Sequence, residues 1–399
     1  MCTIHFRMKY NLFWLANFDE VNKEHLMDTG IILDWNTIEP RKFYTQKRAA
    51  HQLYYAKAQQ SWFIYAYPQA KEVLLHQDAL IPELNTNQTG LNKNAVQLIQ
   101  QLARLNNFEQ HQQSRAAALR IYNQMQPVPT QDLLDLLLKP VIAGVPVDWV
   151  ELVCKRLPAL YILKSLNVGT QDCAFLIDNL PILVKIMAPQ QNPAIIEQLN
   201  ELIDILFPLL QKYLPDSATA PNNIAAEEWA TLLISNLIGL LIQSYDAGRG
   251  LLTNTLLQLA AHQLSLPVIE AENYFDQAVV ETLRFDPPIH LTRRIAGKDL
   301  LIGNQLIKKG EMIIILLAAA NLDPQIFESP LTYNPSRGNN QEHLTFGAGH
   351  HHCMAKHLTT RLTAEVFKIL YHRIQILPQS LAYEPLLNAK LVKNLFITL

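Results

Sequence analysis

Phe346-Gly347-Ala348-Gly349-His350-His351-His352-Cys353-Met354-Ala355 is the stretch of this 399-residue chain that most constrains its fold. It follows a loop and leads into an apolar run that predicts a helix from Met354 to about Arg373. The glycines let the backbone come close to a flat cofactor. The helix that begins after Cys353 directs its positive end at the sulfur and favours the thiolate. Both features suit a cysteine that ligates iron.

Cys353 has two alternative roles besides iron ligation. An isolated cysteine is more commonly a small buried hydrophobic residue. Alternatively, the run His350-His351-His352 and Cys353 binds zinc. However, adjacent residues on one strand cannot all converge on one tetrahedral ion. The motif therefore favours the iron ligand over zinc.

Composition and charge restrict the class of protein. The chain is 49% hydrophobic and 17% charged with a formal net charge of −2, which is ordinary for a globular protein with a large core. Its scattered charges provide no basic field for nucleic acid or an anionic membrane. The four widely spaced cysteines indicate a reducing compartment: Cys2, Cys154, Cys173 and Cys353. Residues 1–20 lack the apolar stretch of a signal peptide, so we expect a cytoplasmic protein without a membrane span.

The order of apolar patterns predicts a mainly α fold with minor β. Residues 61–80 predict an aromatic strand followed by a short helix. From about residue 93 to 262 the apolar residues recur at helical spacing. The helix expected over about 226–263 is apolar nearly all round in its first half, so it should cross the interior. After Pro287, short β-like runs alternate with glycine turns, and a strand is expected at the end of the chain.

The segment around Cys353 resembles the cysteine-ligand loop of cytochrome P450 enzymes, Phe-Gly-x-Gly-x-His/Arg-x-Cys-x-Gly/Ala. The matching residues, all implied to contact the cofactor, are Phe346, Gly347, Gly349, His351, Cys353 and Ala355. The resemblance implies that Cys353 is the axial thiolate of haem b, iron protoporphyrin IX. In this family the thiolate donates electron density to iron and favours cleavage of the oxygen–oxygen bond. The fold implied is a helical domain around haem with small β-sheets.

A second match lies upstream of the cysteine loop. Glu281 and Arg284 share one helical face at i,i+3 spacing, which is most commonly a surface ion pair. They resemble the Glu-x-x-Arg pair of the family, and Arg337 matches the third member of its Glu-Arg-Arg network. That resemblance implies a structural role in holding the cysteine loop. The segment Asn321-Leu322-Asp323-Pro324 is similar to the family's Asn-Arg-Asp-Pro segment, except that Leu322 replaces the arginine, so local packing should differ there.

Several cationic or hydrogen-bond-donating side chains suit the two haem propionates. His111 and Arg115 share a helical face, as in the family's His-x-x-x-Arg motif. Arg294 and His351 complete the set that the resemblance implies. Arginine is favoured for carboxylates because its fork is bidentate and always charged. Each residue alone is more commonly a solvated surface group, but the four occur in the family's order.

The long helix departs from the family's pattern at its centre. The family carries an acid followed by threonine there, which organise water that protonates dioxygen. Here Asp246 keeps the acid, Ala247 stands in place of threonine, and Gly248 follows. Gly248 indicates a local kink or the close approach of a ligand, or else a packing position. Thr253 lies about 10 Å further along the axis, too far to substitute easily, whereas Ser244 is nearer.

The same resemblance suggests a substrate pocket. Its expected walls are the loop around residues 85–94, the helix centre over 239–247, residues 289–291 and the chain end. The candidate side chains are Ile242, Arg249, Ile289, His290, Leu291 and Phe396. Arg249 either binds a substrate carboxylate or pairs with an acid of a neighbouring helix, and the second is favoured because buried charges are usually paired.

Together these matches predict a single cytochrome P450 domain over residues 1–399. Its β-containing part covers about 1–90 and 288–340, and its helical part about 91–287 and 354–375. Its expected function is that of a monooxygenase that inserts one atom of dioxygen into a small or medium organic substrate, in secondary metabolism.

External partners follow from this function. The chain has neither a Gly-x-Gly-x-x-Gly fingerprint nor a cysteine cluster, so electrons should come from NAD(P)H through a reductase and a ferredoxin-type donor. Arg115, Arg120, Lys356 and Arg361 are candidates for a basic docking patch. We expect no nucleic-acid partner and a monomer. Alternatives are a peroxide-dependent enzyme, a haem-thiolate sensor or binding protein with little turnover, and a non-haem His-rich metal site.

Overall fold

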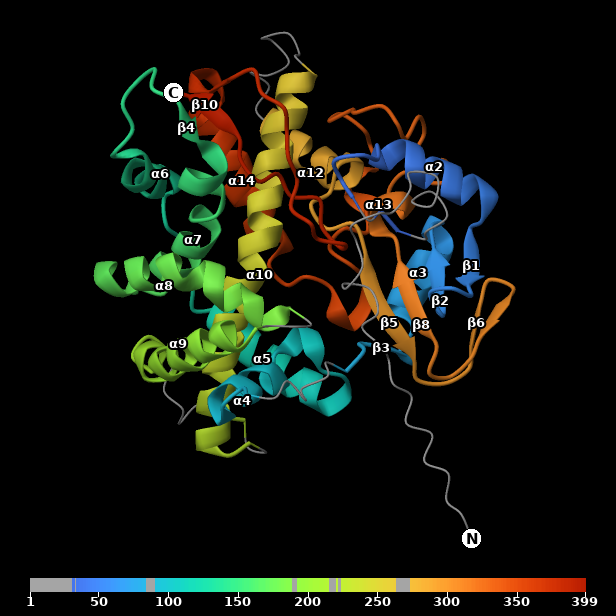
Figure 1. Ribbon diagram of the computed structural model, residues 1–399, viewed down its shortest axis with the longest axis horizontal. Helices are drawn as coiled ribbons and strands as arrows, with labels where there is room; N and C mark the ends of the chain where they lie inside the picture. Colours follow the sequence, from blue (N-terminus) through green and yellow to red (C-terminus); the bar gives the residue numbers. More distant parts are fainter. Residues whose placement is uncertain are drawn as a thin grey trace.

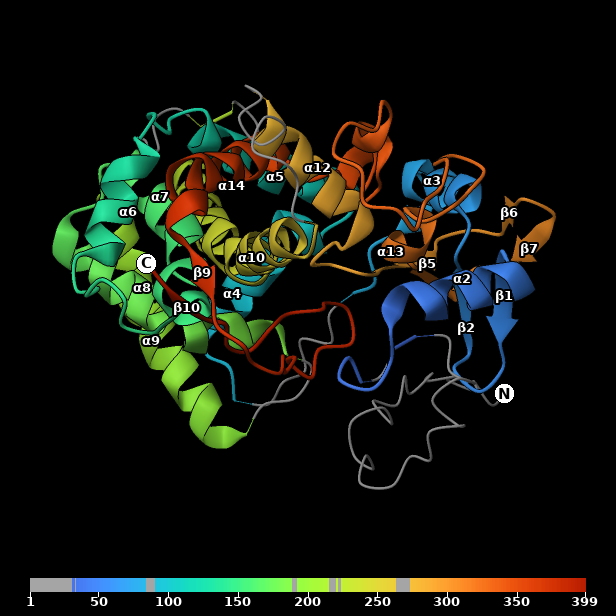
Figure 2. The ribbon, with the colours of Figure 1, turned by 90° about the horizontal axis from the view of Figure 1, so that it is seen from above.

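Helix α10 (Ala226–Ala261) runs through the middle of the helical half in the computed structural model (Figure 1). The structure describes residues 31–399 apart from 33, 84–89, 189–191, 215–219, 222–223 and 263–272. Figure 2 shows α10 along its axis, with other helices around it. Most α10 side chains are buried, because its apolar residues occur on every face of the helix. The helix predicted to cross the interior is confirmed.

The other helices of the described residues surround α10 or cover the largest sheet. They are α2 (Pro40–Ala50), α3 (Tyr67–Leu75), α4 (Lys93–Gln101), α5 (Phe108–Tyr122), α6 (Thr130–Leu138), α7 (Leu157–Ser165), α8 (Thr170–Leu183), α9 (Pro193–Gln211), α12 (Tyr274–Phe285), α13 (Leu317–Ala320) and α14 (Lys356–Leu370). Shorter helical turns are η1 (Ala103–Leu105), η2 (Val150–Cys154), η3 (Val184–Met187), η5 (Asn340–Glu342), η6 (Gly349–His351) and η7 (Tyr371–Arg373).

Local sequence accounts for several helix starts. The side chain of Asn92 accepts a hydrogen bond from the Ala95 amide before α4, and Asn192 caps α9 in the same way at the Ile195 amide. Proline occupies the first turn of α3, as the sequence predicts from Pro68. The first two helices thus begin where an asparagine side chain accepts a hydrogen bond from a free backbone N–H group. The third begins at a proline, which has no N–H group to satisfy.

Within the described residues the β structure consists of three small sheets. The largest has the order β1-β2-β8-β5-β3, from β1 (Leu53–Ala56), β2 (Ser61–Ile64), β3 (Ala79–Leu80), β5 (Thr292–Ala296) and β8 (Met312–Ile315). The second joins β4 (Val147–Asp148), β10 (Phe396–Thr398) and β9 (Gln375–Ile376), and the third pairs β6 (Leu300–Ile302) with β7 (Gln305–Ile307).

The largest sheet lies on the opposite side of the molecule from α6, α8 and α9 (Figure 1). Strand β2 runs parallel to β8, with Ser61 opposite Met312, while the other pairs of this sheet are antiparallel. The apolar run that follows residue 311 is not strand throughout, because α13 replaces it from Leu317. The mainly α fold with minor β is confirmed, and α2 and α3 lie within the part expected to contain β structure.

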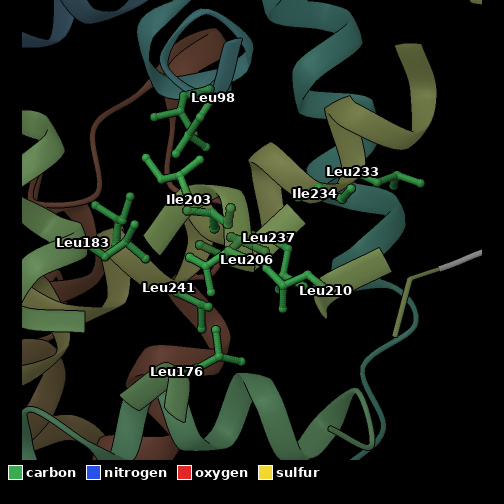
Figure 3. Packing of buried hydrophobic residues seen from close by; sticks show 14 of the residues in the cluster. Leu98, Leu176, Leu183, Ile203, Leu206, Leu210, Leu233, Ile234, Leu237 and Leu241 are labelled. Atoms are coloured by element: carbon green, nitrogen blue, oxygen red, sulfur yellow. The ribbon is translucent and has the colours of Figure 1, made fainter. Parts of the chain in front are cut away.

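The largest core cluster fills the space between α10 and the helices α4, α8 and α9 (Figure 3). Leu98, Leu176, Ile203, Leu206 and Leu241 meet there with almost no exposed surface. α10 is the one helix in the described ranges that is long and apolar enough to cross a membrane, and 67% of its most apolar window is buried inside the molecule. Burial of this kind is typical of the core helix of a soluble protein.

Candidate active site

The cysteine loop has a backbone that only glycine adopts readily. Gly347 and Gly349 both have φ of +69°. A Cβ at Gly349 would lie 2.6 Å from the carbonyl oxygen of Leu74. The Cys353 amide donates to the Phe346 carbonyl over 2.9 Å, which folds the loop back on itself. Gly349 is therefore required by its backbone angle and by the contact with α3, rather than by a cofactor alone.

Three groups around Cys353 favour its thiolate, although burial is the larger influence and keeps the pKa of the thiol above its ordinary value. Burial raises the pKa of the thiol, whereas the Ala355 backbone amide, the Arg115 guanidinium and the Lys356 ammonium lower it. Ala355 is the N-cap of α14, so Cys353 lies just before the positive end of this helix. All three opposing influences stabilise a negatively charged sulfur, the form that a metal binds.

The four residues expected at the propionates lie close together. The rings of His111 and His351 are 4.0 Å apart between centroids. The pKa of His351 is lowered to about 3, first by burial and then by the charges of His111, Arg294 and Arg115. His111 and Arg115 of α5 and Arg294 of β5 therefore converge on the cysteine loop.

The remaining contacts of this cluster go to backbone or neutral groups. The His111 nitrogens lie 2.8 Å from the Ala103 carbonyl and 3.2 Å from the His350 carbonyl. Arg115 donates to the His352 carbonyl over 3.1 Å, and Arg294 donates to its neighbour's carbonyl over 2.7 Å. Within the described ranges no carboxylate pairs with any of the four, and the buried Nδ1 of His351 has no hydrogen-bond partner.

This arrangement fits a group with anionic substituents beside the cysteine. Uncompensated buried charge is costly, so a positive cluster of this kind normally faces an anion. The two propionates of haem b supply two negative charges, and Cys353 supplies the sulfur ligand. The residues present therefore fit haem. In contrast, no group of three or more metal-ligating side chains is found among the described residues for a His-rich metal site.

The Glu281 network is buried at the base of the loop. Arg284 donates to Glu281 over 2.9 and 2.7 Å, and both side chains have no exposed surface. Arg284 also donates to the carbonyls of Asn321 and Pro330. Arg337 lies 3.5 Å from Glu281. The three residues predicted to form a network do lie together.

Asn321 joins this network to the cysteine loop. Its side chain accepts from the Leu344 amide over 2.7 Å and donates to the Thr345 hydroxyl over 2.8 Å. The expected difference in packing at Leu322 also has a structural basis: this residue is buried in a small cluster with Phe285 and Tyr333.

The centre of α10 has one accessible face. Gln243, Ser244, Asp246 and Ala247 keep accessible surface, whereas the residues on either side of this stretch are buried. Spacings of three and four residues connect Gln243 to Asp246 and Ala247, and Ser244 lies three residues before Ala247, so these side chains share one side of the helix. Burial raises the pKa of Asp246, Arg249 lowers it and Glu384 raises it. Asp246 is thus the acid of this face, and Ala247 adds no hydroxyl.

Arg249 pairs with acidic side chains, which is the interpretation that the sequence favoured over binding of a substrate carboxylate. Its guanidinium lies 3.0 Å from Asp246 and 3.2 Å from Glu384 of the C-terminal segment, with only 5% of the residue exposed. Thr253 donates to the Arg249 carbonyl and is buried, so it does not replace the missing threonine.

Gly248 lies on a packed face of the helix. A Cβ there would come within 2.6 Å of Pro158 in α7, and α10 continues as helix through this position. Packing against Pro158, rather than a kink, accounts for the glycine.

The expected substrate wall needs correction at several positions. His290 is 1% exposed and lies against Trp35 and Tyr44, with its Nδ1 2.8 Å from the tyrosine hydroxyl. Leu291 belongs to the same core cluster, and Ile242 belongs to the cluster of Figure 3. These three side chains are enclosed by protein because their neighbours fill the space around them.

The chain end also differs from the expected wall. Phe396 is 44% exposed and lies in β10, where its backbone pairs with Asp148. Ile289 keeps some accessible surface and forms a bridge with Ala389, so the tail approaches this wall near Ala389 rather than at Phe396. Residues 85–89 of the expected loop lie outside the described residues.

Sequence reasoning missed Arg104 and Glu384, and it included Gln243 only as part of the helix centre 239–247 without singling it out. Asp246 interacts electrostatically with both Arg104 and Glu384. A polar Gln243 within an apolar run was a usable signal, because polar residues in a core helix usually face a cavity or a partner. Arg104 and Glu384 offered no comparable signal, because their interaction with Asp246 arises only from tertiary packing.

The glycine-containing thiolate loop, the positive cluster beside it and the long buried helix together define a haem-thiolate protein of mainly α fold. The family model "Cytochrome P450" matches residues 258–375. The cytochrome P450 CYP107DY1 of Priestia megaterium is 30% identical over 282 residues, 68% of each chain. The biotin biosynthesis cytochrome P450 of Bacillus subtilis is 37% identical over 133 residues, 33% of each chain.

Solved structures agree with these matches. The crystal structure of P450BioI in complex with hexadec-9Z-enoic acid ligated acyl carrier protein has a TM-score of 0.75 and 22% identity, covering 90% of this chain and 97% of that one. CalO2 has a TM-score of 0.76 at 16% identity and covers 90% and 96%. This chain belongs to the cytochrome P450 family. At the level of the family it is a haem-containing monooxygenase that receives electrons from redox partners.

Proposed function

We propose that this chain is a cytoplasmic monooxygenase that uses dioxygen to hydroxylate or otherwise oxygenate a small or medium organic substrate, in secondary metabolism. The observation that carries the proposal is the convergence of His111, Arg115, Arg294 and His351 on the loop of Cys353. This convergence suits a thiolate-ligated haem. The accessible acid Asp246 then supplies the proton donor that oxygen activation requires.

The residues of the chain have distinct tasks in this function. Haem b, ligated by Cys353, would supply electron transfer to dioxygen and cleavage of its oxygen–oxygen bond. The Ala355 amide, Arg115 and Lys356 hold negative charge on the sulfur. The positive cluster would hold the propionates by charge-assisted hydrogen bonds. The buried Glu281 network fixes the loop through Asn321, so the sulfur keeps its position.

Asp246 is proposed as the proton donor. Burial raises its pKa, so the carboxyl keeps a proton to a higher pH than an exposed aspartate does. The hydroxyl of Ser244 donates to the Leu241 carbonyl, which leaves the oxygen of Ser244 able to accept but directs its proton away. Ordered water, or a hydroxyl or amide of the substrate, must therefore carry the proton past Ala247.

Ala247 also supports a second candidate function, that of a peroxide-dependent enzyme. Hydrogen peroxide brings its own protons, so this chemistry depends less on the missing threonine hydroxyl. A haem-thiolate sensor with little turnover is the third candidate, because it needs the cysteine loop but no proton donor.

Electrons are proposed to come from NAD(P)H through a reductase and a ferredoxin-type donor. A cleft of about 730 Å3 opens beside the cysteine loop and is lined by Lys71, Phe346, Lys356 and Arg361, among others. Its positive side chains suit an acidic electron donor. Asp276 and Glu342 also line the cleft, so the charge complementarity is local. We further propose that the protein is a monomer with one domain.

The function is tested with the haem-loaded protein. Reduced protein with carbon monoxide should show the long-wavelength Soret band of thiolate-ligated haem, and Cys353→Ser should lose it. Product formation from dioxygen with a ferredoxin and its reductase is then compared with product formation from hydrogen peroxide. Turnover with hydrogen peroxide alone would establish the second candidate. A normal carbon monoxide spectrum without turnover by either route would favour the sensor.

A further inference from the structure

Arg249 bridges two acids that come from different parts of the chain. Its Nη2 lies 3.0 Å from Oδ1 of Asp246 in α10, and its Nη1 lies 3.2 Å from Oε1 of Glu384 in the C-terminal segment. Its Nε is buried and has no hydrogen-bond partner among the described residues. An arginine that binds one carboxylate commonly uses two nitrogens in a fork. Here the guanidinium gives one nitrogen to each acid, so its charge is shared between them.

The guanidinium of Arg249 is enclosed by protein. The side chain is 6% exposed, and its central carbon lies 5.3 Å from the centre of the Tyr245 ring, one turn earlier. At the next residue, Gly250, a Cβ would come within 2.5 Å of both Leu391 and Pro288, so α10 packs directly against the C-terminal segment there. Arg249 therefore has little space to move, and the positions of its two acids decide how its charge is divided.

Glu384 is held in place by its backbone. Its amide donates to the Leu391 carbonyl over 2.8 Å, and the neighbouring Tyr383 forms an antiparallel bridge with Val392. The C-terminal segment is therefore folded back on itself at Glu384. Only 27% of the glutamate side chain is exposed. The carboxylate thus reaches Arg249 from a defined backbone position.

The second carboxylate oxygen of Asp246 is free. Only Oδ1 contacts Arg249, and Oδ2 makes no ion pair or hydrogen bond with the described residues. The Asp246 side chain is 37% exposed, so water can reach it. A carboxyl that is protonated at Oδ2 keeps its contact with the arginine through Oδ1 and can donate the proton from Oδ2. A fork from Arg249 would instead occupy both oxygens and hold the group as a carboxylate.

We propose that Glu384 is a positioning residue for proton donation: it holds one side of the Arg249 guanidinium and so keeps Oδ2 of Asp246 free to carry and donate a proton. Asp246 regains the proton from water at its exposed surface. Without the glutamate, both terminal nitrogens of Arg249 can turn to Asp246 and form a fork. This inference rests on the proposed function and specifies how its proton donor is controlled.

The charges around Asp246 agree with this role for Glu384. Burial raises the pKa of Asp246, Arg249 lowers it and Glu384 raises it. The titratable groups that interact with Asp246 are Arg249, Glu384, Lys155, Arg104 and Tyr245. Lys155 is already paired within its own helical turn. Among the described residues only Arg249 forms an ion pair with Asp246, and only Glu384 competes with Asp246 for that arginine.

The rival explanation is a purely structural ion pair that ties the C-terminal segment to α10. In that case, loss of Glu384 would lower stability without changing the ionisation of Asp246. The proposal instead requires that the ionisation changes, so a direct measurement of the Asp246 carboxyl distinguishes the two.

The test follows the infrared C=O band of protonated carboxyl groups against pH in the haem-loaded protein. The part of the band that is missing in Asp246→Asn belongs to Asp246. In Glu384→Gln its midpoint should move to lower pH by about one unit or more, because Asp246 loses a negative neighbour and gains the whole charge of Arg249. Arg249→Gln should move the midpoint to higher pH. Product yield per electron consumed should follow the same shifts.

Control variants separate charge, shape and route. Glu384→Asp keeps the negative charge, so its midpoint should lie nearer to wild type than that of Glu384→Gln. In an Arg249→Gln background, Glu384→Gln should move the midpoint at most about half as far as in wild type, because Glu384 acts mainly through this arginine. Glu227→Gln makes the same change at the exposed start of α10, about 28 Å away along the helix axis, and should leave the midpoint unchanged. Urea unfolding verifies that each variant is folded.

An Asp246 midpoint that stays unchanged or moves to higher pH in folded Glu384→Gln overturns the proposal and supports the structural ion pair. A full shift in the Arg249→Gln background also overturns it, because Glu384 would then act on Asp246 without the arginine. Shifted midpoints that the product yield does not follow overturn the role in proton donation.

These results are distinguishable from a failure of the proposed function. Midpoints that move as expected in a protein that turns over no substrate with dioxygen contradict the monooxygenase and support the control of Asp246 by Glu384. Turnover with dioxygen and an unchanged midpoint in Glu384→Gln does the opposite.

Discussion

The guanidinium of Arg249 lies 3.0 Å from the carboxylate of Asp246, one turn earlier on α10. The same guanidinium reaches Glu384 in the C-terminal segment over 3.2 Å. The proposed proton donor is therefore held by an arginine that is itself shared with a second acid. This arrangement links the centre of the long helix to the tail, and it leaves Asp246 with a net pKa above its ordinary value because burial outweighs the arginine.

Asp246→Asn should lower the product formed per electron consumed by about tenfold or more, because a positioned acid contributes at least that factor to proton transfer. In wild-type protein the yield should fall as pH rises through the raised pKa of Asp246, since the carboxyl then loses the proton that it donates. The variant should lack this pH step. Product and NAD(P)H consumption are measured together over a pH series, and an unchanged yield in Asp246→Asn removes this residue from proton delivery.

Ala247→Thr should raise the product yield per electron with dioxygen. The side chain lies on the accessible face of α10 beside Asp246, so a hydroxyl added there can order water next to the acid. Turnover driven by hydrogen peroxide should change little, because this oxidant carries its own protons. Ala247→Val has nearly the same shape without the hydroxyl and is the matched control. An equal gain in both variants would show that volume, and not the hydroxyl, is responsible.

Gly248→Ala should destabilise the protein by about 1–3 kcal/mol, the usual range for an overpacked core. The new Cβ would meet Pro158 at 2.6 and 2.9 Å, and the proline ring cannot turn away. Gly239→Ala in the same helix is the control, because its new Cβ would meet the flexible side-chain ends of Leu102 at 2.7 Å and Gln243 at 3.8 Å. Urea unfolding measures both. Equal stability of the two variants would show that Gly248 is not a packing position.

The cysteine loop was predictable because its residues are contiguous, so their spacing alone carries the pattern. Glu281 and Arg284 were also accessible to sequence reasoning, since i,i+3 spacing brings them together within one helix. Arg104 and Glu384 were not, because tertiary packing alone places them near Asp246. For the same reason, the sequence left a kink, the close approach of a ligand and a packing position all open at Gly248, because its packing partner Pro158 comes from another helix.

Glu281→Gln should cost about 3–5 kcal/mol of stability, the range for removing one partner of a buried ion pair. The change leaves the Arg284 guanidinium buried without a counter-charge, and it weakens the contact with Arg337. Haem retention should fall as well, because the network supports the loop through Asn321. Urea unfolding and the carbon monoxide spectrum measure the two effects. Asp299→Asn, which removes an exposed pair with Lys308, should leave both measurements unchanged.

Stability should decrease as the solution becomes acidic, in part because of His290. Burial lowers the pKa of this histidine to about 3 from an ordinary value of 6.5. Between these values the unfolded chain binds a proton that the folded protein does not, so the stability present above pH 6.5 is lost as pH falls, by up to about 1.4 kcal/mol per pH unit. His290→Asn should remove this part of the slope in urea unfolding measured from pH 7 downwards. Tyr44→Phe removes the hydrogen bond to His290 at every pH, so it should lower stability while the slope remains. The two variants therefore separate the pH dependence caused by the lowered pKa of His290 from the stability contributed by its hydrogen bond to Tyr44. An identical slope of stability against pH in His290→Asn and wild type would contradict the assignment of this slope to His290.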